Sequence, residues 1–371
     1  MAPDPTSVDN LLPADRRAMI AGIGGLAAGA LLAGSRTAHA GPLNPPAGPV
    51  ASTGKTLTEV EPRIAINATN TPGDADSVFK ITQPGSYYLT GNIAGVTGKH
   101  GLEIAASQVT VDLNGFSLIG GTGTRDGISA GGGLTDISIR NGTIRNWAQY
   151  GIRLTGAFYS SLLDLRVRAN ALDGIAAGSH SSIRSCVVNA NGASGIFANA
   201  GCLIELCHAI SNATDGVFVT SAGVISRCSA YLNSAAGIRS TGLGYLGIIA
   251  CSSLENVGPG IRVNSGTLVR GNTLAANGRG STPAAGILVD GVDNRIEDNN
   301  STTNGRGIEV VGSGNIIIRN TCSGNTINWA IVANNVYGPI IDRTAPASAA
   351  VNGNAAPDAS GSTHPNANFT F

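Results

Sequence analysis

Three aspartates that each precede a glycine could supply acid–base chemistry: Asp126, Asp173 and Asp215. Asp173 and Asp215 are two sequence repeats apart, and two spacings in a stack of strands correspond to about 9.6 Å. Inverting hydrolysis of a glycosidic bond needs two carboxyl groups about 6.5–9.5 Å apart, so this pair is marginally compatible and is the candidate catalytic pair. Asp-Gly is also a turn signal in its own right, and this structural interpretation is the favoured one.

A second group of residues could bind a ligand without reacting with it. Phe197, Phe218, Arg239 and Arg262 stand at the same position of four consecutive repeats, and Arg153 has this position further upstream. Because side chains alternate along a strand, this position should point outward. Aromatic rings can stack on sugars and arginine binds carboxylates in bidentate fashion, so the five residues predict a stripe that binds an acidic glycan. In the alternative interpretation, the two phenylalanines lie beneath a neighbouring loop.

The elements that position these residues are marked by a glycine followed by an apolar residue, which recurs every 21 to 26 residues. The copies are Gly101-Leu102, Gly127-Ile128, Gly151-Ile152, Gly174-Ile175, Gly195-Ile196, Gly216-Val217, Gly237-Ile238, Gly260-Ile261, Gly286-Ile287 and Gly307-Ile308, followed by a degenerate Ala330-Ile331. A repeat of this length predicts a solenoid in which each unit buries its apolar face only against its neighbours.

Three further columns align with these glycines. An asparagine near the end of each unit is expected to occupy a tight corner: Asn146, Asn170, Asn191, Asn212, Asn233, Asn256, Asn277, Asn304 and Asn325. Five residues earlier stand Asn141, Leu165, Cys186, Cys207, Cys228, Cys251, Asn272, Asn299 and Asn320. Three residues earlier again is a column that is apolar from Leu162 to Ile317. Only its first member, Ser138, is polar. These columns predict an internal ladder of Asn and Cys side chains next to an apolar core.

Short Ile/Val runs interrupted by Gly and Asn predict about three short parallel strands per coil, and the leucine-rich-repeat pattern is absent. Over residues 57–342 the chain resembles the right-handed parallel β-helix, or pectate-lyase-like, superfamily. The segments from Gly85 to Asn92 and from Val109 to Phe116 further resemble the opening of a group of secreted bacterial members. The implied fold is all-β, a single right-handed parallel β-helix of about eleven coils with an N-terminal cap and a loose C-terminal tail.

The resemblance implies no single reaction, because this superfamily includes lyases, hydrolases, epimerases, adhesins and phage tailspikes. The segment Asn212-Ala213-Thr214-Asp215 resembles the Asn-Thr-Asp motif of polygalacturonases with an inserted alanine, but the other motifs of that family are missing. Most coils are 21 to 23 residues long, and the longest insertion, Gly278 to Ala285, is short for building a deep cleft.

We therefore expect a protein that binds polysaccharide or other surface components through an outer strand face. The alternative is a polysaccharide lyase or inverting glycoside hydrolase that acts on an acidic glycan. No cofactor and no metal are expected. The 23 basic residues balance the 23 acidic ones, which argues against a nucleic-acid partner.

Four of the six cysteines, Cys186, Cys207, Cys228 and Cys251, occupy one column on consecutive coils. Neighbouring strands lie about 4.8 Å apart, whereas the Cβ atoms of a disulfide are about 3.8 Å apart. A buried stack of free thiols is therefore favoured over disulfides or a metal site.

The amino terminus indicates export. Arg16-Arg17, a mild apolar stretch and Ala38-His39-Ala40 predict a cleaved twin-arginine-type signal over residues 1–40 and a periplasmic or extracellular protein, which contacts the membrane only through this signal. The apolar stretch is short for a retained membrane anchor, which is the alternative. The remaining divisions are a disordered linker (41–56), a β cap (57–98), the β-helix (99–342) and a flexible tail or cap (343–371) whose last four residues fold back on the final coil.

Overall fold

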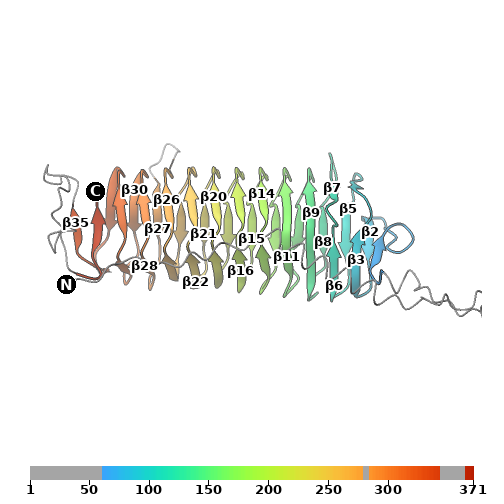
Figure 1. Cartoon of the computed structure of the whole chain (residues 1–371), viewed down its shortest axis with the longest axis horizontal. Coiled ribbons are helices and arrows are strands. Elements are labelled where there is room, and N and C mark those ends of the chain that lie inside the picture. Colours follow the sequence, from blue (N-terminus) through green and yellow to red (C-terminus); the bar gives the residue numbers. More distant parts are fainter. Residues whose placement is uncertain (1–60, 279–283, 343–363) are drawn as a thin grey trace, which may run out of the picture. The chain divides into compact units, whose positions relative to one another are not determined.

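The computed structural model describes residues 61–278, 284–342 and 364–371. The predicted signal and linker, the middle of the predicted longest insertion and most of the predicted tail lie outside these ranges. Within the described residues, the regular secondary structure consists of β-strands alone, and these strands form two parallel sheets. Strand labels follow the sequence order along the stack of coils (Figure 1).

The first sheet, called sheet B below, takes one strand from each coil. Its strands, in spatial order, are β2 (Ser77–Ile81), β5 (His100–Ile104), β8 (Ile128–Ala130), β10 (Ile152–Leu154), β12 (Ile175–Ala177), β15 (Ile196–Ala198), β18 (Val217–Val219), β21 (Ile238–Ser240), β24 (Ile261–Val263), β27 (Ala285–Val289), β30 (Arg306–Val310) and β33 (Ile327–Ile331). The recurring glycine-apolar pairs thus mark one sheet.

The second sheet, called sheet A, takes two short strands from most coils. They are β1 (Ile64–Ile66), β3 (Gly85–Leu89), β4 (Ile93–Ala94), β6 (Val109–Asp112), β7 (Ser117–Ile119), β9 (Ile137–Arg145), β11 (Ser161–Arg168), β13 (Ser182–Arg184), β14 (Val187–Asn189), β16 (Cys202–Glu205), β17 (His208–Ile210), β19 (Gly223–Ser226), β20 (Ser229–Tyr231), β22 (Leu243–Ile249), β23 (Ser252–Leu254), β25 (Ser265–Arg270), β26 (Thr273–Ala275), β28 (Arg295–Glu297), β29 (Asn300–Thr302), β31 (Ile316–Ile318), β32 (Thr321–Ser323), β34 (Val336–Tyr337), β35 (Ile340–Asp342) and β36 (Asn368–Thr370). Strands β13 and β14 both pair with the longer β11, so this coil has two strands in sheet A. With its one strand in sheet B the coil has three strands, which confirms the predicted number.

The described coils number one more than the eleven glycine pairs indicate. Strand β2 lies beside β5 in the same parallel register as the later coils, with Phe79 opposite Leu102 and Lys80 opposite Glu103. At the glycine position β2 carries Val78, so the repeat motif does not mark it. Parallel pairing of sheet B therefore begins at Ser77.

The glycines recur because the next coil occupies the space beside them. A Cβ atom added to Gly216 would lie 2.6 Å from the carbonyl oxygen of Gly237 and 2.7 Å from the side-chain amide of Asn233. The same obstruction, a glycine carbonyl and an asparagine amide of the following coil, recurs at Gly174, Gly195 and Gly260. The glycine is thus a packing requirement of the stack.

The predicted asparagine column is an internal ladder from Asn170 to Asn325. Asn212 donates its side-chain amide to Asn233 Oδ1 at 3.0 Å, and its own Oδ1 accepts the amide of Asn191 at 3.0 Å. The preceding residue adopts the left-handed backbone, as Ser211 does (φ 53°), and not the asparagine itself. The expected role at the corner was therefore wrong, because each asparagine bonds across coils.

The first unit of the predicted columns is displaced by one residue. Leu162 pairs with Ile139 and not with Ser138, and Leu165 pairs with Gly142 and not with Asn141. Trp147 then takes the ladder position, and its main-chain N–H donates to Asn170 Oδ1 at 3.1 Å. The apolar column is consequently unbroken, while Asn141 and Asn146 lie exposed with left-handed backbones.

The final described residues continue the stack. Strand β36 pairs in parallel with both β32 and β35, and Asn320 donates its side-chain amide to Asn368 Oδ1 at 3.3 Å. The second asparagine ladder, through Asn272, Asn299 and Asn320, is thereby extended by a residue 48 positions further along the chain.

Candidate functional site

The outward-facing column of sheet B carries the predicted stripe. Strand pairing aligns Phe197 with Phe218, Phe218 with Arg239, and Arg239 with Arg262. The complete column is Lys80, Glu103, Ser129, Arg153, Ala176, Phe197, Phe218, Arg239, Arg262, Leu288, Glu309 and Ala330. Arg153 is therefore in the same column, separated from Phe197 by Ala176.

The middle of this column is a contiguous series of contacts. The rings of Phe197 and Phe218 meet edge to face, with centroids 5.4 Å apart. The guanidinium carbon of Arg239 lies 4.2 Å from the centroid of Phe218. Both phenylalanines are partly exposed, so they form an accessible apolar surface flanked by a cation.

Next to this surface lies an open depression of about 270 Å³. Its lining residues are Arg239, Ser240, Thr241, Arg262, Asn264 and Asp290. Arg239 Nε lies 2.8 Å from Asp215 Oδ2, and Arg262 Nε donates to Asp290 Oδ2 at 2.7 Å. Among the described residues, neither arginine donates a hydrogen bond from its terminal guanidinium nitrogens. Those nitrogens can bind an anion in the depression.

The three aspartates that precede glycines share a structural role. Asp173 Oδ1 accepts the main-chain N–H of Ser194 at 2.7 Å, and Asp215 Oδ1 accepts that of Ala236 at 3.0 Å. Asp126 Oδ1 similarly accepts the N–H of Tyr150 at 3.2 Å. In each case the donor occupies the same position one coil later. One carboxylate oxygen of each residue is therefore used to join adjacent coils.

Burial raises the pKa of both Asp173 and Asp215 above the usual aspartate value. For Asp215 the nearby Arg239 opposes this effect, whereas for Asp173 the charge of Asp215 adds to it. Asp215 is only 2% exposed, and its Oδ2 faces Arg239. This carboxylate is thus placed to orient the arginine, and Asp173 is the more accessible of the two.

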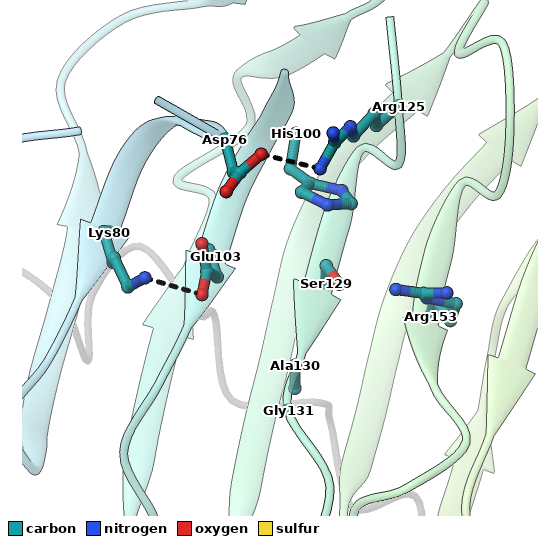
Figure 2. Close-up of a pocket in the computed structure, with 9 residues that line it drawn as sticks. All are labelled: Asp76, Lys80, His100, Glu103, Arg125, Ser129, Ala130, Gly131 and Arg153. Carbon is teal, nitrogen blue, oxygen red and sulfur yellow. Dashed lines mark ion pairs between the residues drawn. The ribbon is translucent and has the colours of Figure 1, made fainter. Parts of the chain in front are cut away.

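A second depression, of about 230 Å³, lies on the same face over β2, β5, β8 and β10 (Figure 2). Its lining residues are Asp76, Lys80, His100, Glu103, Arg125, Ser129, Ala130, Gly131 and Arg153. Lys80 pairs with Glu103 at 2.9 Å and Arg125 with Asp76 at 2.9 Å. Beneath them, the buried Asp126 Oδ2 lies 3.0 Å from Arg153 Nε.

Of the residues that line or underlie this second depression, the sequence predicted only Arg153 as a binding residue and only Asp126 as a candidate for acid–base chemistry. A signal for His100 was present, because it precedes Gly101 at the position that Asp126 occupies before Gly127. Lys80 carried no such signal, since β2 lacks the glycine.

The cysteines are buried and free. Cys207 donates its thiol to the carbonyl oxygen of Glu205 at 3.3 Å, and Cys228 to that of Ser226 at 3.3 Å. All six cysteines are buried and free, and this includes Cys186, Cys207, Cys228 and Cys251, for which a buried stack of free thiols was predicted. In the part of the chain that the structure covers, no group of three or more His, Cys, Asp or Glu side chains is arranged to hold a metal, and no helix could span a membrane.

Comparison with known proteins identifies the fold family. The family described as "Right handed beta helix region" matches residues 85–223 and 199–327, which together exceed half of the chain. No curated protein matches the sequence.

Solved structures agree with this family. The mannuronan C-5 epimerase AlgE6 A-module of Azotobacter vinelandii is similar with a TM-score of 0.55 and 17% identity, over 68% of this chain and 89% of that one. The catalytic domain of a GH87 alpha-1,3-glucanase in complex with tetrasaccharides has a TM-score of 0.52 and 12% identity, over 83% and 62%. The Dettilon tailspike protein has a TM-score of 0.48 and 13% identity, over 69% and 60%. At these identities the likeness to the epimerase module and the glucanase shows the fold alone. The family match establishes that the chain belongs to the right handed beta helix region family.

Proposed function

We propose that this protein is exported and binds an acidic polysaccharide along the outer face of sheet B. The observation that carries the proposal is the unbroken series Phe197, Phe218 and Arg239, whose neighbouring side chains are in contact. Sugar rings present apolar faces that suit the phenylalanines, and carboxylates suit the arginines beside them. Two relatives with the same fold are named for mannuronan and for a glucan, which supports a polysaccharide ligand.

The charges near the stripe favour a polyanion that makes many weak contacts. Arg262 donates its Nε–H to Asp290, and Arg239 holds Nε 2.8 Å from Asp215 without a hydrogen bond, so the terminal nitrogens of both arginines can meet a ligand. The side chain of Arg262 is 45% exposed, so any single ion pair there is weakened by solvent. A linear polymer that repeats its carboxylates can engage several such positions at once, which raises the total affinity.

Retention on immobilised polysaccharides tests the proposal. The protein should be retained on polygalacturonate and not on dextran, and retention should fall as salt rises because screening weakens ion pairs. Phe197→Ala and Phe218→Ala should each weaken retention about tenfold. Phe158→Ala, at an exposed phenylalanine outside the column, is the matched control. Equal retention of all three variants would remove the stripe from the binding surface.

Catalysis on the same glycan is the second candidate function. The observation that favours it is the raised pKa of Asp173 and Asp215, since raising the pKa of a carboxyl group brings it closer to the range that suits a general acid. The use of Asp215 in orienting Arg239 counts against it. Incubation with polygalacturonate, followed by assays for reducing ends and unsaturated products, separates the two functions. Product that disappears in Asp173→Asn would establish catalysis.

Export through the twin-arginine route rests on residues 1–40, which lie outside the described residues. Replacing Arg16→Lys and Arg17→Lys together should hold the full-length protein in the cytoplasm of an expressing bacterium. Continued export of this variant would exclude that route.

A further inference from the structure

We propose that Arg145, Arg166 and Arg168, on the outer surface of sheet A, bind the phosphate groups of an anionic polymer. Arg145 belongs to β9, and the other two residues belong to the neighbouring β11. These three residues are called the arginine patch below. None of them lies in sheet B, so the patch does not depend on the function proposed above.

The arginine patch is unusual because it has no carboxylate partner. Of the fifteen arginines among the described residues, eleven form an ion pair with an acidic side chain. The exceptions are Arg270 and the three members of the patch. The patch arginines also donate no hydrogen bond to another described residue. Three of the four unpaired arginines therefore gather at one place, where their charge is available to a ligand.

The register of β9 and β11 brings the three side chains together. Arg145 lies directly opposite Arg168, so two like charges extend from adjacent strands whose backbones are about 4.8 Å apart. Arg166 and Arg168 flank the fully buried Val167, so both arginines point outward from the same strand, and both are exposed. Like charges directly opposite each other destabilise a sheet, and a bound anion would offset that repulsion.

The strands around the patch carry no acidic side chain. On this face, sheet A consists of residues 143–145 of β9, residues 166–168 of β11, and the short strands β7, β14, β17, β20, β23, β26, β29, β32 and β36. None of these segments contains Asp or Glu. The nearest carboxylate on β11 is Asp164, which is exposed, has a left-handed backbone (φ 52°) and forms no ion pair with a described residue. The positive charge of the patch is thus not cancelled on this face.

Three neighbouring guanidinium groups suit phosphate better than carboxylate. A carboxylate has two oxygens in one plane, which match the fork of a single arginine. A phosphate group presents three acceptor oxygens and up to about two negative charges, so Arg145 and Arg168 can bind the same group. Arg166 can then meet the same phosphate or the next one along a polymer. Because exposed ion pairs are individually weak, a polymer that engages all three arginines is favoured over a single phosphate ion.

The neighbours of the patch favour a phosphate polymer without bases. Single-stranded nucleic acids gain much of their affinity from bases that stack on aromatic rings. The residues opposite the patch on the adjoining strands are Ile119, Thr143, Val187 and Asn189, and none of them is aromatic. The patch therefore offers contacts to a chain of phosphates and none that would hold a base.

Binding of the whole protein to immobilised long-chain polyphosphate tests the proposal, with biolayer interferometry as the measurement. The protein should bind at low salt and lose affinity as salt rises, because screening weakens exposed ion pairs. Single-stranded DNA of equal charge should bind at least about fivefold more weakly, because no ring stacks on its bases. Failure to bind polyphosphate at low salt, or DNA binding of equal strength, would overturn the proposal.

A triple variant and a control of equal charge locate the site. Arg→Gln at all three patch positions should weaken polyphosphate binding at least about tenfold, because three ion pairs are lost. Arg125→Gln, Arg270→Gln and Arg306→Gln together change the net charge equally at other surface positions. This control should change the affinity less than about twofold, because screening limits the reach of distant charges. Equal losses in both triple variants would mean that net charge alone attracts the polymer and would refute the patch.

Two further measurements separate this role from a structural one and from the stripe on sheet B. Because Arg145 and Arg168 repel each other in the free protein, the patch variant should unfold in urea at a midpoint no lower than that of the wild type. A clearly lower midpoint would show that the arginines hold the fold together and would overturn the proposal. Retention on polygalacturonate, which tests the stripe, should be unchanged in the patch variant, so either proposal can fail without the other. Loss of that retention would make the patch a carboxylate site and refute its preference for phosphate.

Discussion

The guanidinium carbon of Arg239 lies 4.2 Å from the ring centroid of Phe218, one coil earlier in the stack. The same arginine places Nε 2.8 Å from Oδ2 of Asp215, the residue before the glycine that precedes the strand of Phe218. One side chain thus joins the apolar part of the outer column to its charged part. Because Asp215 also accepts an N–H from the following coil, the position of Arg239 is fixed by the stack itself.

Neutralising Asp290 should strengthen binding of an acidic glycan. Asp290 accepts the Nε–H of Arg262 at 2.7 Å and lines the depression, so its charge competes with a ligand carboxylate. Asp290→Asn should raise affinity for polygalacturonate about twofold to fivefold, as expected for an exposed ion pair. Asp164→Asn, at an exposed aspartate in β11 of sheet A, serves as the control. A loss of affinity in Asp290→Asn would mean that orientation of Arg262 matters more than its free charge.

Removing a central member of the asparagine ladder should destabilise the fold strongly. Asn212 donates to Val188 O and Asn233 Oδ1, and its Oδ1 accepts both the main-chain and side-chain N–H of Asn191. Asn212→Ala leaves several buried groups without partners, and we expect a loss of about 3 kcal/mol in the free energy of unfolding. Urea denaturation measures it. Asn199→Ala, which removes one exposed hydrogen bond to Thr155 O, should cost less than about 1 kcal/mol.

Alkaline pH should destabilise the protein through the thiol stack. The neighbouring thiol of Cys186, together with burial, raises the pKa of Cys207 from its usual 9.0 to about 12. Above pH 9 the unfolded chain therefore loses a proton that the folded protein keeps, and the free energy of unfolding falls as pH rises towards 12. For this one thiol the loss is about 2 kcal/mol between pH 9 and pH 10.5.

Comparison of the wild type with Cys207→Ala in urea at pH 8.5 and pH 10.5 measures this contribution together with the part that Cys207 adds to the raised pKa of the neighbouring Cys228. The variant should lose less stability over that interval. Identical losses would show that the thiol ionises as readily in the folded protein as in the unfolded chain.

Adding a methyl group at a recurring glycine should disrupt the stack. In Gly216→Ala the new Cβ atom would meet the Gly237 carbonyl and the Asn233 amide below 3.0 Å, and both belong to the rigid ladder region. We expect destabilisation of about 3 kcal/mol, measured by the denaturation midpoint. Gly91→Ala introduces a Cβ atom with no neighbour within 4 Å and should change stability by less than about 0.5 kcal/mol. Similar midpoints for the two variants would contradict the packing explanation of the repeat.

Much of the fold follows from the sequence because a solenoid repeats one set of contacts. The Gly216 position needs glycine for the same steric reason as the Gly195 and Gly260 positions, so the same residue recurs from unit to unit. The outward alignment of Phe197, Phe218, Arg239 and Arg262 follows in turn, since one fixed position in each repeat stacks on the next. The displaced columns near Asn141 and Asn146 show where this reasoning failed, because a one-residue change in spacing cannot be assigned to a turn from sequence alone.

The coil, its glycine and asparagine columns, the buried thiols and the outward stripe could therefore be predicted from the amino-acid sequence. The three-dimensional structure was needed to show that β2 extends sheet B and brings Lys80 beside Glu103, and that Asn368 completes a ladder 48 residues after Asn320. It also decided which acid each arginine meets, Asp215 for Arg239 and Asp290 for Arg262. The physical reason is that repeat spacing fixes which backbone positions stack, whereas ion pairs and end contacts depend on turn lengths and side-chain rotamers that no repeat encodes.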